Sequence, residues 1–407
     1  MRRHALLLIL GALAAPACAE DGTGPPGLTA DTVASPGAVS VTAGEPEIVL
    51  RYRADSCEPE DLPDIQARAF RRTDNTVVLV SGNAPRNYWM AGTGFNALTR
   101  ICSPVLVSGD DPRAEMFDAQ EWIVSVYREG NVVHALVHNE YHDPGPRNCK
   151  PGDTSPANPC WYNAITYASS TDGARTFRQL AAPAHVVAAA PKRWDPVTLR
   201  GAPGPYGYFS PSNIVRGRDG AFYAVFFAIP DRDRQTERGT CLMRTTNLAE
   251  PSSWRAWDGT GFTIRMASAY VTDGAPPCAF IAPRELADLH GSLTYNRYLD
   301  RYLLVGTSVE SNGAGGYTCG FFFSLSPDLV RWTPRQLLRP ARQPFPPCTT
   351  AGPEGSEIYP SIIDHADTST NFEFSFQAPY LYYVRWNQGL NRDLLRVSIR
   401  FELAQGS

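Results

Sequence analysis

Residues Tyr206–Trp257 read YGYFSPSNIVRGRDGAFYAVFFAIPDRDRQTERGTCLMRTTNLAEPSSWRAW. SNIVRG predicts a short strand, and a turn at Arg218–Gly220 leads from it into the long apolar strand AFYAVFFAI. Asp-Gly between two apolar runs is a strong hairpin signal, because both residues accept positive φ angles. A polar loop, a third strand TCLMRTTNL and the beginning of a fourth, SSWRAW, follow. Four antiparallel strands with short turns are what one blade of a β-propeller requires.

The same pattern recurs along the chain. Gly291–Trp332 repeats the two strands, the turn and the Thr-Cys that starts a third strand, and in both copies a Trp follows that Cys by 13 residues. A third copy starts with EWIVSVYREGNVVHALVHNEYH, and weaker copies flank these three. Repeats of this length indicate a ring or an array of similar units. First strands can be placed near Ile65, Glu121, Ser212, Gly291 and Tyr359. The sequence therefore predicts an all-β fold, a five-bladed β-propeller of four-stranded antiparallel blades.

The N-terminal region predicts export. Residues 1–19 combine two arginines, the apolar run ALLLILGALAA and small residues, as in a secretory signal peptide. Its end fits either cleavage after Ala19 or a lipoprotein signal, in which Cys18 would carry lipid and anchor the protein to a membrane. Residues 20–44, rich in Gly, Pro, Ala and Thr, predict a disordered tether. Residues 45–407 are expected to form the single propeller domain, in which EPEIVLRYR near the start can pair with the C-terminal LLRVSIRFEL and close the ring.

Composition excludes several classes of partner. The net charge of −4 on 407 residues does not favour nucleic acid or an anionic membrane surface. No stretch after the signal is apolar enough to cross a bilayer. We expect an extracytoplasmic monomer, either secreted, periplasmic or held at a surface as a lipoprotein.

The nine cysteines become eight once Cys18 is removed or lipidated. An even number in an exported chain indicates disulfides. Cys160, Cys241 and Cys319 each start the third strand of a different blade, so they should lie apart and bond to local partners. The expected disulfides are Cys149–Cys160, Cys241–Cys278, Cys319–Cys348 and, from the remaining two, Cys57–Cys102.

The candidate site follows from propeller topology. The starts of first strands, the ends of second strands and the starts of third strands share one rim, where ligands usually bind. His138, Glu140 and His142 end a second strand and share one face, because strand side chains alternate. Other candidate binding residues on this rim are Arg68, Trp161, Tyr162, Asn163, Asn213 and His290. Carboxylates, histidines, an arginine and aromatic rings together suit a polar, ring-shaped ligand such as a sugar.

Carboxylates on the same rim suggest glycoside hydrolysis, in which two carboxyl groups flank the scissile bond. Asp64 is the first candidate for base or nucleophile, Glu121 and Glu140 compete for the acid, and Glu357 is the reserve. His138-x-Glu140-x-His142 could bind a metal, but alternation along a strand spreads three ligands too widely for easy chelation. We therefore expect no metal or cofactor in the site. A structural Ca²⁺ in the central channel stays an alternative, although nothing in the sequence signals it.

The blade pattern resembles the five-bladed propellers of glycoside hydrolase families 43, 32 and 62. SLSPDLVRW (Ser324–Trp332) and YPSIID (Tyr359–Asp364) are similar to a turn and a first strand of those blades. SSTDGARTF (Ser169–Phe177) resembles the Asp-box of sialidases, with Ala and Phe replacing its Gly and Trp. The resemblance implies a catalytic role for Asp64 by position. The Asp that those families carry in a middle blade is absent here, because Tyr208–Asn213 has Ser and Asn in its place.

Three functional hypotheses remain. The first is a secreted or surface-anchored glycoside hydrolase acting on a poly- or oligosaccharide through paired carboxylates. The second is a non-catalytic carbohydrate-binding or surface-interaction propeller. The third is a sialidase-like enzyme, which would need an arginine cluster, with Arg68, Arg244 and Arg385 available, and a Tyr nucleophile beside a Glu.

Overall fold

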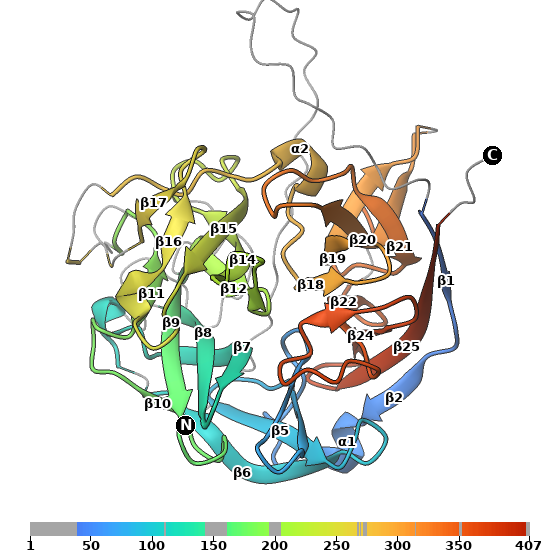
Figure 1. The fold of residues 1–407 in the computed structure, drawn as a ribbon, viewed down its shortest axis with the longest axis horizontal. Helices are drawn as coiled ribbons and strands as arrows, with labels where there is room; N and C mark the ends of the chain where they lie inside the picture. Colours follow the sequence, from blue (N-terminus) through green and yellow to red (C-terminus); the bar gives the residue numbers. More distant parts are fainter. Residues whose placement is uncertain are drawn as a thin grey trace, which may run out of the picture.

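The computed structural model describes residues 39–109, 111–142, 161–194, 205–266, 268, 270–271, 275–313, 315–349 and 352–403. Nearly all of their regular structure is strand. The two α-helices of this part are single turns, α1 (Tyr52–Asp55) and α2 (Pro283–Leu286), and two 3₁₀ turns cover Ala114–Met116 and Pro251–Ser253. The sheets stand around a common centre, which is the arrangement of a β-propeller (Figure 1). Neither α-helix is long and apolar enough to cross a membrane.

The first sheet along the ring contains four antiparallel strands in sequence order. They are β3 (Arg68–Arg71), β4 (Val77–Val80), β5 (Arg86–Gly92) and β6 (Thr99–Val107). β3 and β6 are the two edges of this sheet, and β6 lies on the outside of the ring (Figure 1).

The second sheet has eleven strands and consists of two antiparallel halves. The first half holds β7 (Gln120–Glu129), β8 (Val132–His142), β9 (Trp161–Ser170), β10 (Arg178–Gln179) and β11 (Val186–Ala189). The second half holds β12 (Tyr206–Pro211), β13 (Val215–Arg216), β14 (Phe222–Ile229), β15 (Gly239–Thr245), β16 (Arg255–Trp257) and β17 (Phe262–Arg265). The halves join where β12 pairs in parallel with β9.

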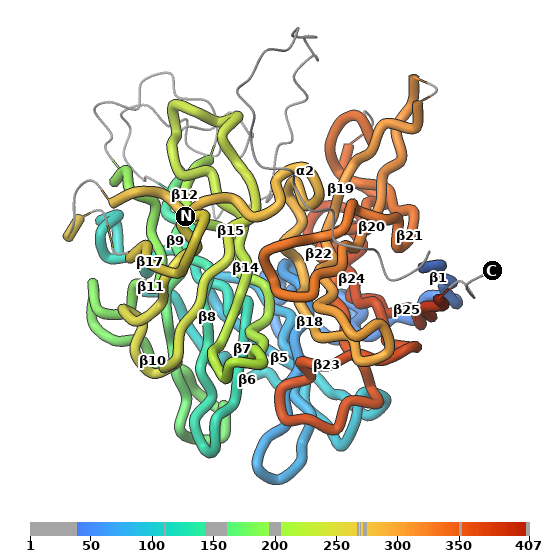
Figure 2. The backbone as a smooth tube through the Cα atoms, turned by 45° about the horizontal axis from the view of Figure 1, so that its top comes forward, coloured from blue at the N-terminus to red at the C-terminus, as the bar shows by residue number. Residues whose placement is uncertain are grey.

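Two five-stranded sheets complete the ring. One contains β18 (Ser292–Asn296), β19 (Arg301–Ser311), β20 (Tyr317–Ser326) and β21 (Gln336–Pro340), with β23 (Phe374–Ser375) parallel to β18. The other contains β22 (Glu357–Ile363), β24 (Tyr380–Trp386), β25 (Arg392–Leu403), β1 (Val39–Ala43) and β2 (Glu47–Leu50). Figure 2 shows β23 beside β18, so that a segment from the last sheet reaches the previous one.

The two ends of the chain meet in the last sheet. β2 pairs with β25, as the alternating residues after Glu45 predict. β1 pairs with the distal part of β25, so Val39–Ala43 is ordered strand, although the tether was expected to extend to residue 44. The reason is that apolar and polar residues alternate in VSVTA, and this segment pairs with the free edge of the long strand β25.

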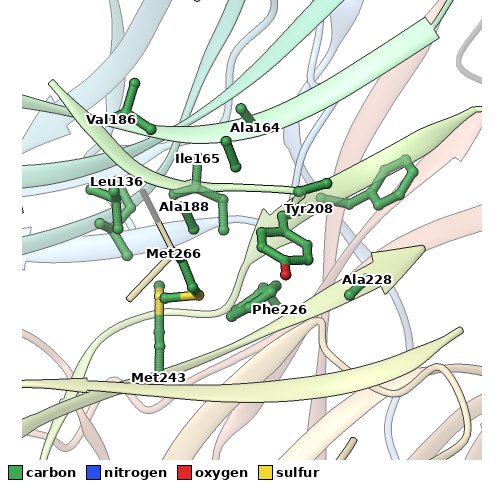
Figure 3. Close-up of a cluster of buried hydrophobic side chains, with 14 of the residues drawn as sticks. Leu136, Ala164, Ile165, Val186, Ala188, Tyr208, Phe226, Ala228, Met243 and Met266 are labelled. Carbon is green, nitrogen blue, oxygen red and sulfur yellow. The ribbon is translucent and has the colours of Figure 1, made fainter. Parts of the chain in front are cut away.

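Apolar side chains between neighbouring sheets form the core. The largest cluster fills the space between the two halves of the eleven-stranded sheet (Figure 3). Its members are buried by more than nine-tenths, and burial of each large side chain contributes about 1.5–3 kcal/mol. Figure 3 labels Leu136, Ala164, Ile165, Val186 and Ala188 from the first half, Tyr208, Phe226, Ala228 and Met243 from the second, and Met266.

Three of the four expected disulfides are present. Cys57 bonds to Cys102, Cys241 to Cys278 and Cys319 to Cys348. The fourth expected pair, Cys149–Cys160, lies outside the described residues, as do Cys18 and the signal region. Three local disulfides fit an extracytoplasmic protein.

Candidate functional site

The centre of the ring is filled by the side chain of Arg68. This residue is 2% exposed, and its guanidinium donates hydrogen bonds to the innermost segment of every sheet and of both halves of the large one. The acceptors are Ala67 O at 3.2 Å, Val124 O at 3.0 Å, Pro211 O at 3.5 Å, Gly291 O at 2.7 Å and Ser361 Oγ at 3.0 Å. A guanidinium has five N–H donors, and here each has an acceptor in the protein. Arg68, predicted to bind substrate, thus holds the inner strands together.

Arg68 is a buried cation without an ion-pair partner among the described residues. Burial lowers its pKa to about 9, which still leaves the side chain protonated at neutral pH. The positive charge therefore persists at the centre of the ring, surrounded by carbonyl dipoles.

Strand β8 carries a carboxylate held by two histidines. His138, Glu140 and His142 project from the same face of β8. His138 Nε2 lies 2.9 Å from Glu140 Oε1, and His142 Nε2 lies 3.3 Å from Glu140 Oε2. Glu140 is fully buried, whereas the side chain of His142 is 27% exposed. One carboxylate thus accepts from two imidazoles, one of which reaches solvent.

Aromatic rings from several strands surround this triad. His142 stacks on Trp161 at 5.3 Å between ring centroids, and His138 faces Phe209 at 6.3 Å. Phe227 lies 5.3 Å from Phe209 and stacks in turn on His290 at 5.5 Å. We call these residues, together with Tyr359, the Glu140 cluster. Its members are His138, Glu140, His142, Trp161, Phe209, Phe227, His290 and Tyr359.

Tyr359 belongs to the cluster because the charge of Glu140 affects the pKa of its phenol. Burial raises the pKa of Tyr359 well above its usual range, and the negative charge of Glu140 adds to the effect. Its φ angle is 57°, in the left-handed region, and Tyr359 lies within the register shift between Ile358 and Ser361. A non-glycine residue in this conformation costs about 1–2 kcal/mol, and such strain concentrates at functional sites.

The cluster sets distinct protonation states for its groups. Burial alone would raise the pKa of Glu140, but the hydrogen bonds from His138 and His142 outweigh it, and the pKa is lowered. Burial lowers the pKa of His290, and the positive charges of Arg68 and His138 act in the same direction. At neutral pH the cluster therefore presents an ionised carboxylate beside a neutral His290 and a neutral Tyr359.

Asp64 lies in the segment before β3, and its carboxylate already has a partner in the protein. It is 2% exposed and forms an ion pair with Arg392, the first residue of β25. The guanidinium of Arg392 also stacks on Trp386, 4.5 Å from the ring centroid. The pair ties the segment before β3 to the last sheet, so Asp64 has a structural role whether or not it also acts on a substrate.

Glu121 faces away from the Glu140 cluster. In the β7–β8 ladder the residue opposite Glu140 is Gln120, so Glu121 points to the other face of the hairpin. There its carboxylate accepts a hydrogen bond from Gln179. Burial raises the pKa of Glu121 to about 8, partly offset by this bond. Glu121 and Glu140 therefore cannot flank the same bond of a substrate.

Glu357 is the fourth candidate carboxylate. It accepts two hydrogen bonds from Arg339, at 2.6 and 3.3 Å. Because Arg339 lies on β21, the outermost strand of the neighbouring sheet, this interaction takes the Glu357 carboxylate toward the periphery. None of the interactions described for Asp64, Glu121 and Glu357 connects them to Glu140.

The remaining predicted binding residues connect strands. Asn163 donates to Tyr206 O at 3.0 Å across the junction of the two half-sheets. The side chain of Asn213 bonds to both backbone groups of Leu293, accepting from its N–H at 2.8 Å. Tyr162 is buried against Tyr206. These three side chains support the walls around the site.

Sequence reasoning missed three residues of the cluster: Phe209, Phe227 and Tyr359. Phe209 and Phe227 lie in almost continuously apolar strands, where an inward-facing ring cannot be told from a core ring. Tyr359 stands at an expected first-strand start, and a Tyr-Pro pair there was the available signal, although its left-handed backbone was not readable. Within the described residues no group of three or more His, Cys, Asp or Glu is arranged to hold a metal.

Comparisons with known proteins give structural likeness without a family. No protein-family model and no curated protein sequence matches the chain. A Dyadobacter fermentans protein of unknown function is similar in structure, with a TM-score of 0.47 and 11% identity over 89% of this chain and 99% of its own. An α-L-arabinofuranosidase from Lactobacillus brevis has a TM-score of 0.46 and 10% identity, covering 86% and 94%. An endo-arabinase from Bacteroides thetaiotaomicron has a TM-score of 0.45 and 9% identity, covering 89% and 99%. At these values the function has to be argued from the residues of this chain.

Proposed function

We propose that this protein is an extracytoplasmic glycoside hydrolase that acts on an oligo- or polysaccharide at the Glu140 cluster. The observation that carries the proposal is the Glu140 carboxylate, fully buried, ionised and held by two histidines among stacked aromatic rings. Aromatic faces bind sugar rings, and a preorganised carboxylate can stabilise or attack an oxocarbenium-like centre. Because its pKa is lowered, Glu140 suits the base or nucleophile rather than the acid.

We further propose that the ring consists of five blades. Dividing the eleven-stranded sheet at the parallel β9–β12 pairing gives two blades, with β7 and β12 innermost. The hydrogen bonds of Arg68 support this count, because they reach five separate inner segments. A lipid anchor at Cys18 remains part of the proposal for localisation.

A two-carboxylate mechanism needs a partner for Glu140. Asp64, which precedes the first strand β3, is the candidate that remains, and substrate would have to draw it from its ion pair with Arg392. Glu121 is protonated at neutral pH, as a general acid should be, but it lies on the wrong face of its hairpin.

The engagement of these carboxylates favours one alternative, a non-catalytic carbohydrate-binding propeller. Asp64, Glu121 and Glu357 each have a protein partner away from Glu140. The sialidase-like hypothesis has less support, because Arg68 bonds to carbonyls while Arg244 pairs with Asp219 and Arg385 with Asp393, so the three arginines do not form one cluster. The raised pKa of Tyr359 also opposes a phenolate nucleophile.

The test is reducing-sugar release from a panel of polysaccharides and aryl glycosides by the disulfide-intact protein. Glu140→Gln and Asp64→Asn are compared with Glu357→Gln, a matched change in a carboxylate outside the cluster. The proposal expects turnover by wild type and by Glu357→Gln, and at least a hundredfold loss in Glu140→Gln with ligand binding retained. Binding without turnover by wild type on every substrate would establish the binding module instead.

A further inference from the structure

A cavity lies at the opposite end of strand β18 from His290 of the Glu140 cluster. It encloses about 400 Å³, within the range of small-ligand pockets. Its lining consists of Arg218, Tyr295, Arg297, Asp300, Tyr302 and Phe374. These residues come from the turn between β13 and β14, from the turn between β18 and β19 with the flanking strand residues, and from β23.

Strand β18 gives the separation of the two sites. His290 of the Glu140 cluster precedes β18, and Arg297 follows it. At about 3.3 Å per residue, the seven steps between them span roughly 20 Å. The two sites therefore cannot hold the same sugar ring, although one polysaccharide chain can reach both.

Arg297 is the distinctive residue of this cavity. Its guanidinium lies 4.0 Å from the centroid of the Phe374 ring. Among the described residues its side chain has no hydrogen-bond or ion-pair partner. Arg218 is different, because it bonds to the Tyr295 hydroxyl and lies 3.2 Å from Asp300 Oδ1. A stacked guanidinium keeps its N–H edge free for a planar anion.

The walls around Arg297 are aromatic and rigid. The Tyr295 and Tyr302 rings meet edge to face at 5.1 Å, and Tyr302 is buried. The Phe374 backbone is fixed by the parallel pairing of β23 with β18, which sets Tyr295 opposite Phe374 (Figure 2). Aromatic faces held in place beside a cation suit a flat, charged ring.

The surrounding charge also favours an anion. The guanidiniums of Arg218, Arg244, Arg297 and Arg301 outnumber the carboxylates of Asp219 and Asp300 by four to two. Asp300 stays ionised, because the hydroxyl of Tyr295 and the charge of Arg218 hold its pKa low, but its partners are Tyr295 and Arg218 and not Arg297. This excess of two positive charges occurs on a chain whose net charge is −4.

We propose that this cavity is a second carbohydrate site that binds a carboxylated sugar, a hexuronate unit of a polysaccharide. Its carboxylate would take the free edge of Arg297, and its ring would lie against Tyr295 and Phe374. That the anion is part of a sugar rests on the proposed function, whereas the anion site itself rests only on the cavity.

The test is calorimetric titration with trigalacturonate and with its carboxyl-reduced counterpart. We expect the acidic trimer to bind at least tenfold more tightly than the reduced one. Arg297→Gln should remove that preference, while Arg265→Gln, a matched change at another exposed arginine, should leave it intact. Equal affinity of the two trimers, or acidic binding unchanged in Arg297→Gln, would overturn the inference, as would equal displacement of both trimers by millimolar sulfate.

The outcome is separable from that of the proposed function. Turnover of the best neutral substrate from the hydrolysis panel is measured for Arg297→Gln and for Glu140→Gln. The two inferences together expect Arg297→Gln to keep turnover and lose the acidic trimer, and Glu140→Gln to lose turnover and keep the trimer. Loss of the trimer in Glu140→Gln alone would place it in the first site and overturn the second.

Discussion

Replacing Arg68 with Met tests whether one side chain holds the centre of the ring. Methionine is of similar length and apolar, so it fills the space but donates nothing. Three acceptors lie within 3.0 Å of the guanidinium, namely Val124 O, Gly291 O and Ser361 Oγ. Each buried acceptor left without a donor costs about 1–3 kcal/mol, so the three together cost about 6 kcal/mol.

Two effects reduce this cost. The variant no longer buries a charge, and the lowered pKa of Arg68 shows that burial opposes that charge in the folded protein. Water that enters the vacated centre can also satisfy some of the carbonyls. We therefore expect the free energy of unfolding to fall by about 4 kcal/mol, equivalent to a melting temperature lower by about 5 °C for a domain of this size.

Calorimetry or far-UV circular dichroism at pH 7 measures the change, with Arg265→Met as the control at an exposed arginine. Arg68→Lys should fall between wild type and Arg68→Met, since an ammonium keeps the charge but has three donors on a single point. A melting temperature of Arg68→Met within about 1 °C of the Arg265→Met control would refute the reasoning and reduce Arg68 to a space-filling residue.

Three further predictions concern protonation and the disulfides. Burial raises the pKa of Glu121 to about 8 from 4.5, so between these pH values the folded protein binds a proton that the unfolded chain releases. The free energy of unfolding should therefore fall as pH rises from 4.5 to about 8, by up to about 1.4 kcal/mol per pH unit. Glu121→Gln should remove that fall in a series of melts from pH 5 to 9, and parallel curves for the two proteins would contradict it. His142→Phe keeps a ring beside Trp161 but removes a hydrogen-bond donor to Glu140, so the pKa of Glu140 should rise. The acidic limb of the pH–rate profile should then shift to higher pH by about one unit. An unchanged acidic limb would show that Glu140 does not set it. Cys57–Cys102 spans 45 residues, so replacing both cysteines with serine should lower the free energy of unfolding by about 4 kcal/mol. The melting temperature of the variant should be lower than that of wild type. Reductant should then lower it by less than it lowers that of wild type, because this disulfide is already absent.

Local patterns in the sequence were sufficient for the strands and for the closure of the ring. The turn at Arg218–Gly220 is present, but only Gly220 takes a positive φ, at 79°. Asp219 contributes instead by accepting the N–H of Ala221 through its carboxylate at 3.1 Å. Alternation after Glu45 located β2 and its partner β25, since a period of two is a property of neighbouring residues.

Long-range partners and the directions of side chains could not be predicted from the sequence. Asp64 pairs with a residue 328 positions away, and nothing near either residue indicates the other. Glu121 was placed on the site rim, but its direction depends on the register of β7 against β8, where one residue more or less reverses every side chain. Arg68 resembled a ligand-binding arginine because it stands at the right position on the right strand, and only the five surrounding segments show what it binds.

Arg68 is linked to the Glu140 cluster through His290. Burial lowers the pKa of His290, and the positive charge of Arg68 adds to this effect. The buried carboxylate of Glu140 no longer contacts water, and His138 and His142 supply its hydrogen bonds instead. The same guanidinium binds Gly291 O at the start of β18, the strand that leads from His290 to Arg297. A single buried cation therefore helps to keep His290 of one proposed site neutral and holds the start of the strand that leads to the other, so Arg68→Met should weaken turnover by more than its loss of stability alone accounts for.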